Sequence, residues 1–82
     1  EDVFTEELAK ESLIGREFSY KRSIFTPGAG SYWYDTQKMI VPLTRSGRIE
    51  LRVCWILFPE TWEFVVDTQT GEVLSAVDVS SL

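Results

Sequence analysis

The stretch WEFVVDTQTGEVL, residues 62–74, decides the fold because it contains the pattern of a complete β-hairpin. Apolar residues alternate with others from Trp62 to Val66, as in a strand with one buried face. Asp67 and the threonines after it can bond to loop amides, and Gly71 suits a left-handed position at the end of the turn. The sequence therefore predicts two antiparallel strands joined by this turn.

The chain before this hairpin predicts further strands. Residues 38–43 form one, and Pro42 inside it predicts an edge position or a bulge. After a turn, residues 48–58 alternate again. We expect one face of that strand to be core because it is wholly apolar: Ile49, Leu51, Val53, Trp55 and Leu57. The other face turns from charged to apolar at Cys54, so the second half of the strand should be covered on both sides.

Residues 5–15 predict a short helix. Thr5 can cap its start and Gly15 suits its end. Its expected apolar side consists of Phe4, Leu8 and Ile14. A helix of this length does not hold alone in water, so it has to pack on the rest of the chain.

After the helix, the period changes to two. Residues 17–24 predict a half-buried strand, although a helix that continues to Tyr20 stays an alternative. Residues 26–31 contain a proline and two glycines, which predict a loop.

These elements predict an α+β fold, with a short N-terminal helix packed on a four- to five-stranded antiparallel meander sheet. The 82 residues are enough for one small domain, 1–82. Because the chain begins at Glu1 and its first methionine is Met39, we expect a processed form or an excised piece of a larger protein.

The charge pattern argues against a nucleic-acid partner. The net charge is −5, and the only adjacent basic pair is Lys21-Arg22, so no basic face for phosphates is expected. No stretch approaches the roughly 20 apolar residues of a membrane span, so we expect no membrane insertion within this segment.

The residues for catalysis are scarce. Histidine is absent, which removes the usual general base and zinc ligand. Cys54 stands alone in an apolar run, where a small buried hydrophobe is expected rather than a reactive or metal-binding thiol. A carboxylate pair of glycosidase type would have to come from Glu50, Glu60, Glu63, Asp67 and Glu72. Glu50 and Glu63 fall opposite the expected core, where solvated charges ordinarily lie. The sequence predicts no enzyme, no catalytic residue, no cofactor and no metal site.

The C-terminal hairpin resembles the signature of the PepSY domain, in which an aromatic strand leads into a Val-Asp-x-x-Thr-Gly turn and a Val-Leu strand. The matching residues are Trp62, Val66, Asp67, Thr70, Gly71, Glu72, Val73 and Leu74. Residues 39–43 and 49–55 are similar to the paired strands before that turn in propeptides of thermolysin-like and fungalysin-like secreted metallopeptidases. The resemblance covers residues 38–79, and residues 1–37 lie outside it.

The resemblance implies a non-catalytic propeptide or inhibitory module, extracellular or in the cell envelope, that binds a metallopeptidase domain, in the same precursor or separately. It gives Trp62, Asp67, Thr70 and Gly71 a structural role in the hairpin. The alternative is an extracytoplasmic scaffold or sensor domain of a larger envelope protein, without a peptidase partner.

Three clustered aromatic residues, Tyr32, Trp33 and Tyr34, are the candidates for contact with a protein partner. Aromatic side chains are enriched at the centres of interfaces. The alternative is that all three seal the open side of the sheet.

Overall fold

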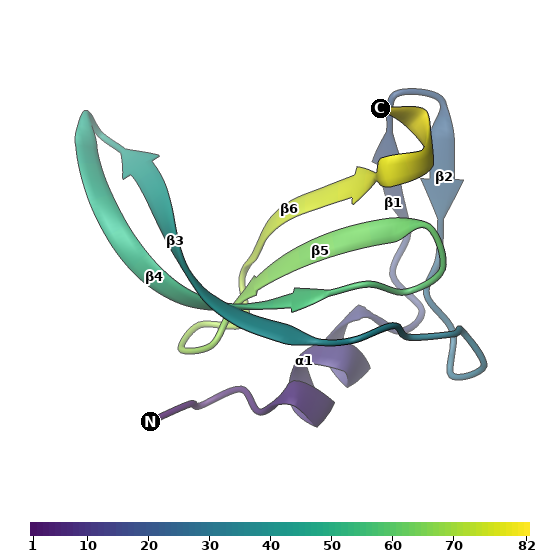
Figure 1. Ribbon diagram of the computed structural model, residues 1–82, viewed down its shortest axis with the longest axis horizontal. Helices are drawn as coiled ribbons and strands as arrows, with labels where there is room; N and C mark the ends of the chain where they lie inside the picture. The colour runs from purple at the N-terminus through teal and green to yellow at the C-terminus, as the bar shows by residue number, and fades with distance from the viewer.

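The computed structural model describes all residues, 1–82, and Figure 1 shows their arrangement. One helix precedes six strands and a final single turn. These elements are α1 (Glu6–Leu13), β1 (Phe18–Tyr20), β2 (Ser23–Phe25), β3 (Gln37–Arg45), β4 (Arg48–Leu57), β5 (Trp62–Asp67), β6 (Val73–Asp78) and the 3₁₀ turn η1 (Val79–Ser81).

The main sheet is an antiparallel meander in the order β3-β4-β5-β6, so each strand pairs with its neighbour in sequence. β1 and β2 pair separately as a two-stranded hairpin. α1 lies below the sheet in Figure 1 and contacts β4. The predicted α+β class, a short N-terminal helix on an antiparallel meander, is confirmed.

The single strand predicted over residues 17–24 is wrong, and so is the alternative of a helix to Tyr20. The chain turns after Tyr20, and Phe18 pairs with Phe25. Lys21 has a φ of 54°, in the left-handed region, which lets the backbone reverse within two residues. Because polar and apolar residues alternate on both sides of this turn, periodicity alone does not reveal it.

Helix α1 begins at the predicted cap. Thr5 Oγ1 accepts a hydrogen bond from Leu8 N at 3.2 Å. The predicted apolar side is wrong, because Leu8 is 48% exposed and Ile14 39%, whereas Ala9 and Leu13 are fully buried. Ala9 and Leu13, four residues apart on one side of the helix, belong to the core cluster and form the face that α1 buries.

The core lies between α1 and the face of the sheet formed by β5 and the end of β4. As predicted, Trp62, Phe64 and Val66 share this face and are buried. Phe18 meets Phe64 edge-to-face at 4.7 Å between ring centroids, and Phe25 stacks on Trp62 at 5.5 Å. The central cluster is Ala9, Leu13, Leu57, Trp62, Phe64 and Val66.

The β3–β4 hairpin continues beyond the helix-covered part of the sheet, and Figure 1 shows it curving away from the other strands. We call residues 40–53 the arm and all other residues the body. The prediction that Ile49, Leu51 and Val53 are core is wrong, because they are 74%, 71% and 41% exposed. The eight-residue α1 is about 12 Å long and the ten-residue β4 about 33 Å, so the helix covers only part of the strand.

Other expectations for this hairpin are confirmed. β3 is an edge strand of the sheet, as Pro42 predicts. In the second half of β4, Cys54 and Ile56 are buried on one face and Leu57 on the other. The turn at the tip consists of two residues, of which Gly47 has a φ of +73°.

Candidate functional site

A short extended segment before β3 carries the three clustered aromatic residues, and its backbone is fixed to the β4–β5 turn. Tyr32 N donates to Glu60 Oε2 at 2.7 Å, and Glu60 N donates back to Tyr32 O at 2.8 Å. Tyr34 N donates to Phe58 O at 2.9 Å. Glu60 has a φ of 55°, a strained conformation for a residue with a side chain. These bonds hold the segment in one position.

The three aromatic side chains have different surroundings. Trp33 is half-buried and packs against the core, with Lys10 Nζ 5.7 Å from its ring centroid. Tyr32 is 63% exposed and Tyr34 54%. Their rings meet edge-to-face, with centroids 4.6 Å apart. Trp33 therefore helps to seal the sheet, as the alternative expects, while the two tyrosines face solvent.

The tyrosine pair borders a surface hollow of about 550 Å³ between α1 and the start of β3. Lys10 Nζ and Glu6 Oε2 form an ion pair at 2.9 Å on its helix side. Hydrogen bonds from Lys10 and Thr36 hold the pKa of Glu6 below its usual value. The lining residues are Glu6, Lys10, Tyr32, Trp33, Tyr34, Asp35, Thr36, Gln37 and Phe58. The hollow thus combines an aromatic rim with charged groups.

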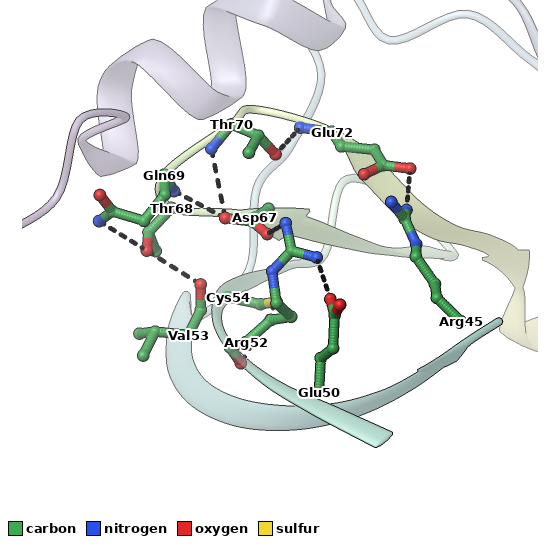
Figure 2. Close-up of polar contacts among 10 residues, drawn as sticks. All are labelled: Arg45, Glu50, Arg52, Val53, Cys54, Asp67, Thr68, Gln69, Thr70 and Glu72. Atoms are coloured by element: carbon green, nitrogen blue, oxygen red, sulfur yellow. Dashed lines mark hydrogen bonds and ion pairs between the residues drawn. The ribbon is translucent and has the colours of Figure 1, made fainter. Parts of the chain in front are cut away.

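The β5–β6 loop is held by its own side chains, as Figure 2 shows. Asp67 Oδ1 accepts hydrogen bonds from Gln69 N at 2.7 Å and Thr70 N at 3.2 Å. Thr70 Oγ1 accepts one from Glu72 N at 3.1 Å. Thr68 departs from the expected pattern, because its hydroxyl donates to the carbonyl of Val53 on β4 at 2.9 Å. The loop polar groups serve the turn and its attachment to β4.

The N-terminal segment covers the same loop. Val3 N and Phe4 N both donate to Thr68 O, at 3.1 and 2.8 Å. Trp55 Nε1 donates to Phe4 O at 2.8 Å. Phe4, which the sequence places on the apolar side of the helix, instead lies against Gly71. A Cβ added at Gly71 would lie 2.5 Å from Phe4 Cζ. Gly71, at φ +74°, is thus required by both backbone conformation and space.

Ion pairs tie the arm to this loop (Figure 2). Arg52 Nη2 contacts Asp67 Oδ2 at 2.5 Å, and Arg52 Nη1 contacts Glu50 Oε1 at 3.2 Å. Asp67 is 1% exposed, so Arg52 compensates a buried charge. Arg45 pairs with Glu72 at 2.5 Å on the exposed side. The arm is therefore held in its curved position on one face by polar contacts.

The acidic residues considered for a catalytic pair do not share a cleft. None of Glu50, Glu60, Glu63, Asp67 and Glu72 lines the hollow. Three of them belong to the ion pairs just described, and Glu60 bonds to the backbone of Tyr32. Glu63 is half-buried on β5. These contacts connect neighbouring strands and loops of the domain.

Cys54 is fully buried, and its thiol lies 3.7 Å from the carbonyl oxygen of Arg52. Burial, followed by the nearby Asp67 carboxylate, raises the pKa of the Cys54 thiol above its usual value. It is a packing residue, as predicted.

No group of three or more His, Cys, Asp or Glu side chains is placed to hold a metal ion. None of the helices has the length and apolar character needed to cross a membrane. Comparison of the chain with known protein families, with curated proteins and with solved structures finds no match.

A second candidate surface, absent from the sequence predictions, is the outer face of the arm. Cross-strand pairing places Ile40 opposite Val53 and Thr44 opposite Ile49, all on the face that continues the core. Four large apolar side chains on it are exposed: Ile40, Ile49, Leu51 and Val53. The signal for this surface lies in the sequence, since the predicted helix is too short to cover the predicted strand.

Proposed function

We propose that this domain is a non-catalytic protein-binding module and that Tyr32 and Tyr34 lie at the centre of its partner-binding surface. The exposed tyrosine pair on a hydrogen-bonded backbone carries the proposal. Tyrosine gives a large contact area at a low cost in conformational entropy, and the fixed backbone lowers that cost further. The hollow beside the pair offers Lys10 and Asp35 for polar contacts that select a partner.

The partner that we propose is a metallopeptidase domain, in the same precursor or separate, and the mode of binding is that of an inhibitory propeptide. The resemblance of the β5–β6 hairpin and of the strands before it to PepSY propeptides supports this choice. The same resemblance supports an extracellular or cell-envelope location. Main-chain and aromatic contacts at the surface of the enzyme would provide the affinity.

The alternative is a scaffold or sensor domain of a larger envelope protein, without a peptidase partner. The exposed apolar face of the arm favours it, because such a face is covered when a domain packs against a neighbour.

The test is a titration of the purified domain against thermolysin-like and fungalysin-like peptidases, followed with a small fluorogenic substrate. We expect saturable, stoichiometric inhibition of at least one enzyme, with the domain left uncut. The double variant Tyr32→Ser, Tyr34→Ser should weaken that inhibition about tenfold or more.

The matched control is Ile24→Ser, because Ile24 is 67% exposed on β2 and does not line the hollow. It should inhibit like the unmodified domain. Slow digestion of the domain without inhibition of any enzyme would overturn the peptidase proposal and leave the scaffold or sensor role. Inhibition unchanged by the tyrosine substitutions would remove Tyr32 and Tyr34 from the binding surface.

A further inference from the structure

One lysine that lines the hollow lies between a carboxylate and an aromatic ring. Lys10 Nζ pairs with Glu6 Oε2 at 2.9 Å and lies over the ring of Trp33, 5.7 Å from its centroid. The carboxylate and the negative face of the ring attract the same ammonium group. Because Glu6 already compensates the charge of Lys10, this pair adds no net charge to the hollow.

The same arrangement occurs a second time at the start of β3. Lys38 Nζ pairs with Asp2 Oδ2 at 2.6 Å and lies over the ring of Trp55, 5.2 Å from its centroid. Lys38 and Trp55 are cross-strand partners, and Asp2 comes from the N-terminal segment. A cation held between a carboxylate and an aromatic ring is therefore a recurring feature of this domain.

The tyrosine pair and Asp35 bring a further carboxylate and further aromatic rings to the hollow, and no basic side chain of the chain pairs with them. Asp35 is exposed and takes part in none of the ion pairs. None of the cation–π contacts within the chain uses Tyr32 or Tyr34. Their edge-to-face packing leaves a face of each ring free of the other ring. These groups are therefore open to a cation from outside the chain.

The charges around the hollow favour a cation over an anion. The charged residues that line it are Glu6, Lys10 and Asp35, which are two carboxylates and one ammonium group with a net charge of −1. The carboxylate of Glu60 lies beside the tyrosine pair, where it accepts a hydrogen bond from Tyr32 N. The net charge of −5 on the whole chain adds to the negative potential. An apolar side chain is a poorer ligand, because it would cover these charged groups without pairing with them.

Of the two basic side chains, arginine is the better match to tyrosine rings beside a carboxylate. Its planar guanidinium stacks on an aromatic face and can also donate two parallel hydrogen bonds to a carboxylate. The ammonium group of lysine is more strongly hydrated and has no planar face to stack. The hollow, at about 550 Å³, lies within the size range of sites that hold a small ligand.

We propose that the hollow binds an arginine side chain exposed on the protein partner, with its guanidinium against the tyrosine pair and paired with Asp35. The arginine belongs to the partner described above, and this assignment therefore rests on the proposed function. Tyr32 and Tyr34 provide the contact area, and the carboxylate of Asp35 selects the charge. The partner surface is thus complementary in charge to this side of the domain.

The test is an NMR titration of the full chain with short probe peptides. One is acetyl-Gly-Arg-Gly-amide, and the other carries citrulline, the neutral isostere of arginine, in place of the arginine. We expect saturable shifts of the backbone amides of residues 32–37 and about three- to tenfold tighter binding of the arginine peptide. This preference should decrease as the salt concentration rises. A third peptide, with lysine at the central position, should bind more weakly than the arginine peptide.

Two variants assign the binding to the proposed groups. Asp35→Asn should remove most of the preference for arginine over citrulline, and Tyr34→Leu should weaken binding of the arginine peptide. The matched control is Glu17→Gln, because Glu17 is an exposed carboxylate that belongs to no ion pair and does not line the hollow. It should bind both peptides like the unmodified chain. All three sites are exposed, so the melting temperatures of the variants should match that of the unmodified chain.

The peptide titration and the peptidase titration can fail separately. Equal binding of the arginine and citrulline peptides, or an equal loss in Asp35→Asn and Glu17→Gln, would overturn the arginine site. Equal binding of the lysine peptide would overturn the choice of arginine. Inhibition of a peptidase that is unchanged by Asp35→Asn would also overturn the site and leave the peptidase partner in place. Binding of the arginine peptide without inhibition of any peptidase would overturn the peptidase partner and leave the site in place.

Discussion

In the body, β5 places Trp62, Phe64 and Val66 on one face of the sheet, and none of the three is more than 3% exposed. In the arm, β4 places Ile49 and Leu51 on the same face of the same sheet, and both are more than 70% exposed. The two regions share the two-residue alternation, so the alternation specifies which side chains lie together and not what covers them. The difference comes from the elements that cover the sheet, because α1 and the β1–β2 hairpin pack on the first region only.

The largest expected effect is the loss of stability when a core side chain of the body is shortened, compared with the same change in the arm. Phe64→Ala should destabilise the body by about 3–5 kcal/mol, because it leaves a cavity beside Phe18 and Trp62. In a chain of this length, whose total stability is about 4–12 kcal/mol, much of the fold would be lost. Ile49→Ala in the arm should cost no more than about 0.5 kcal/mol. Urea unfolding at low protein concentration measures both, and equal losses would show that the arm face is covered.

The next largest effect is the loss of stability when alanine replaces a glycine, compared at two glycines of nearly equal φ. Gly71→Ala should cost about 2–4 kcal/mol, since the new methyl group meets the ring of Phe4 in addition to the strain of the left-handed backbone. Gly47→Ala at the arm tip has open space around it and should cost only about 1 kcal/mol. Thermal melts of the two variants give the difference. If both lose the same amount, the N-terminal segment does not pack on the loop.

A third comparison concerns two ion pairs of arm arginines. Arg52→Gln should cost about 2 kcal/mol, because it leaves the Asp67 carboxylate buried without its partner. Arg45→Gln removes a pair whose two side chains are both 44–45% exposed, and its effect should stay within about 0.5 kcal/mol. Urea unfolding in low and high salt separates the two, since only the exposed pair is screened.

The smallest expected effect is a change in stability at acidic pH, and it comes from Asp78 at the end of β6. Hydrogen bonds to Asp78, first from the Ser80 side chain and then from Ser23, lower its pKa from an ordinary 3.8 to about 2. A lowered folded-state pKa gives stability that is complete above pH 3.8 and is lost as the pH falls toward 2. Asp78→Asn should therefore flatten the decline in melting temperature over this window. Glu17→Gln, on an exposed residue, is the control and should leave the decline intact.

Much of the fold follows from local sequence signals. The Thr5 cap, the edge position of Pro42 and the turn after Asp67 rest on the chemistry of single residues, and all three are confirmed. The errors concern long-range packing. The turn at Lys21 is hidden by the alternation around it, and the exposure of Ile49 depends on how far a distant helix reaches.

The sequence indicates the location of the aromatic cluster but not the surroundings of its members. The three aromatic residues 32–34 are consecutive in the sequence, so their clustering is evident without a structure. The different surroundings of Trp33 and of the two tyrosines depend on hydrogen bonds to the β4–β5 turn, which no local sequence pattern specifies. The Arg52–Asp67 pair was missed for the same reason, because the two residues meet only after β4 and β5 have paired.

Hydrogen exchange of the backbone amides, measured at low protein concentration, tests the contrast between body and arm most directly. An uncovered arm predicts fast exchange in residues 40–53 and slow exchange in β5. An arm as protected as β5 would contradict the account.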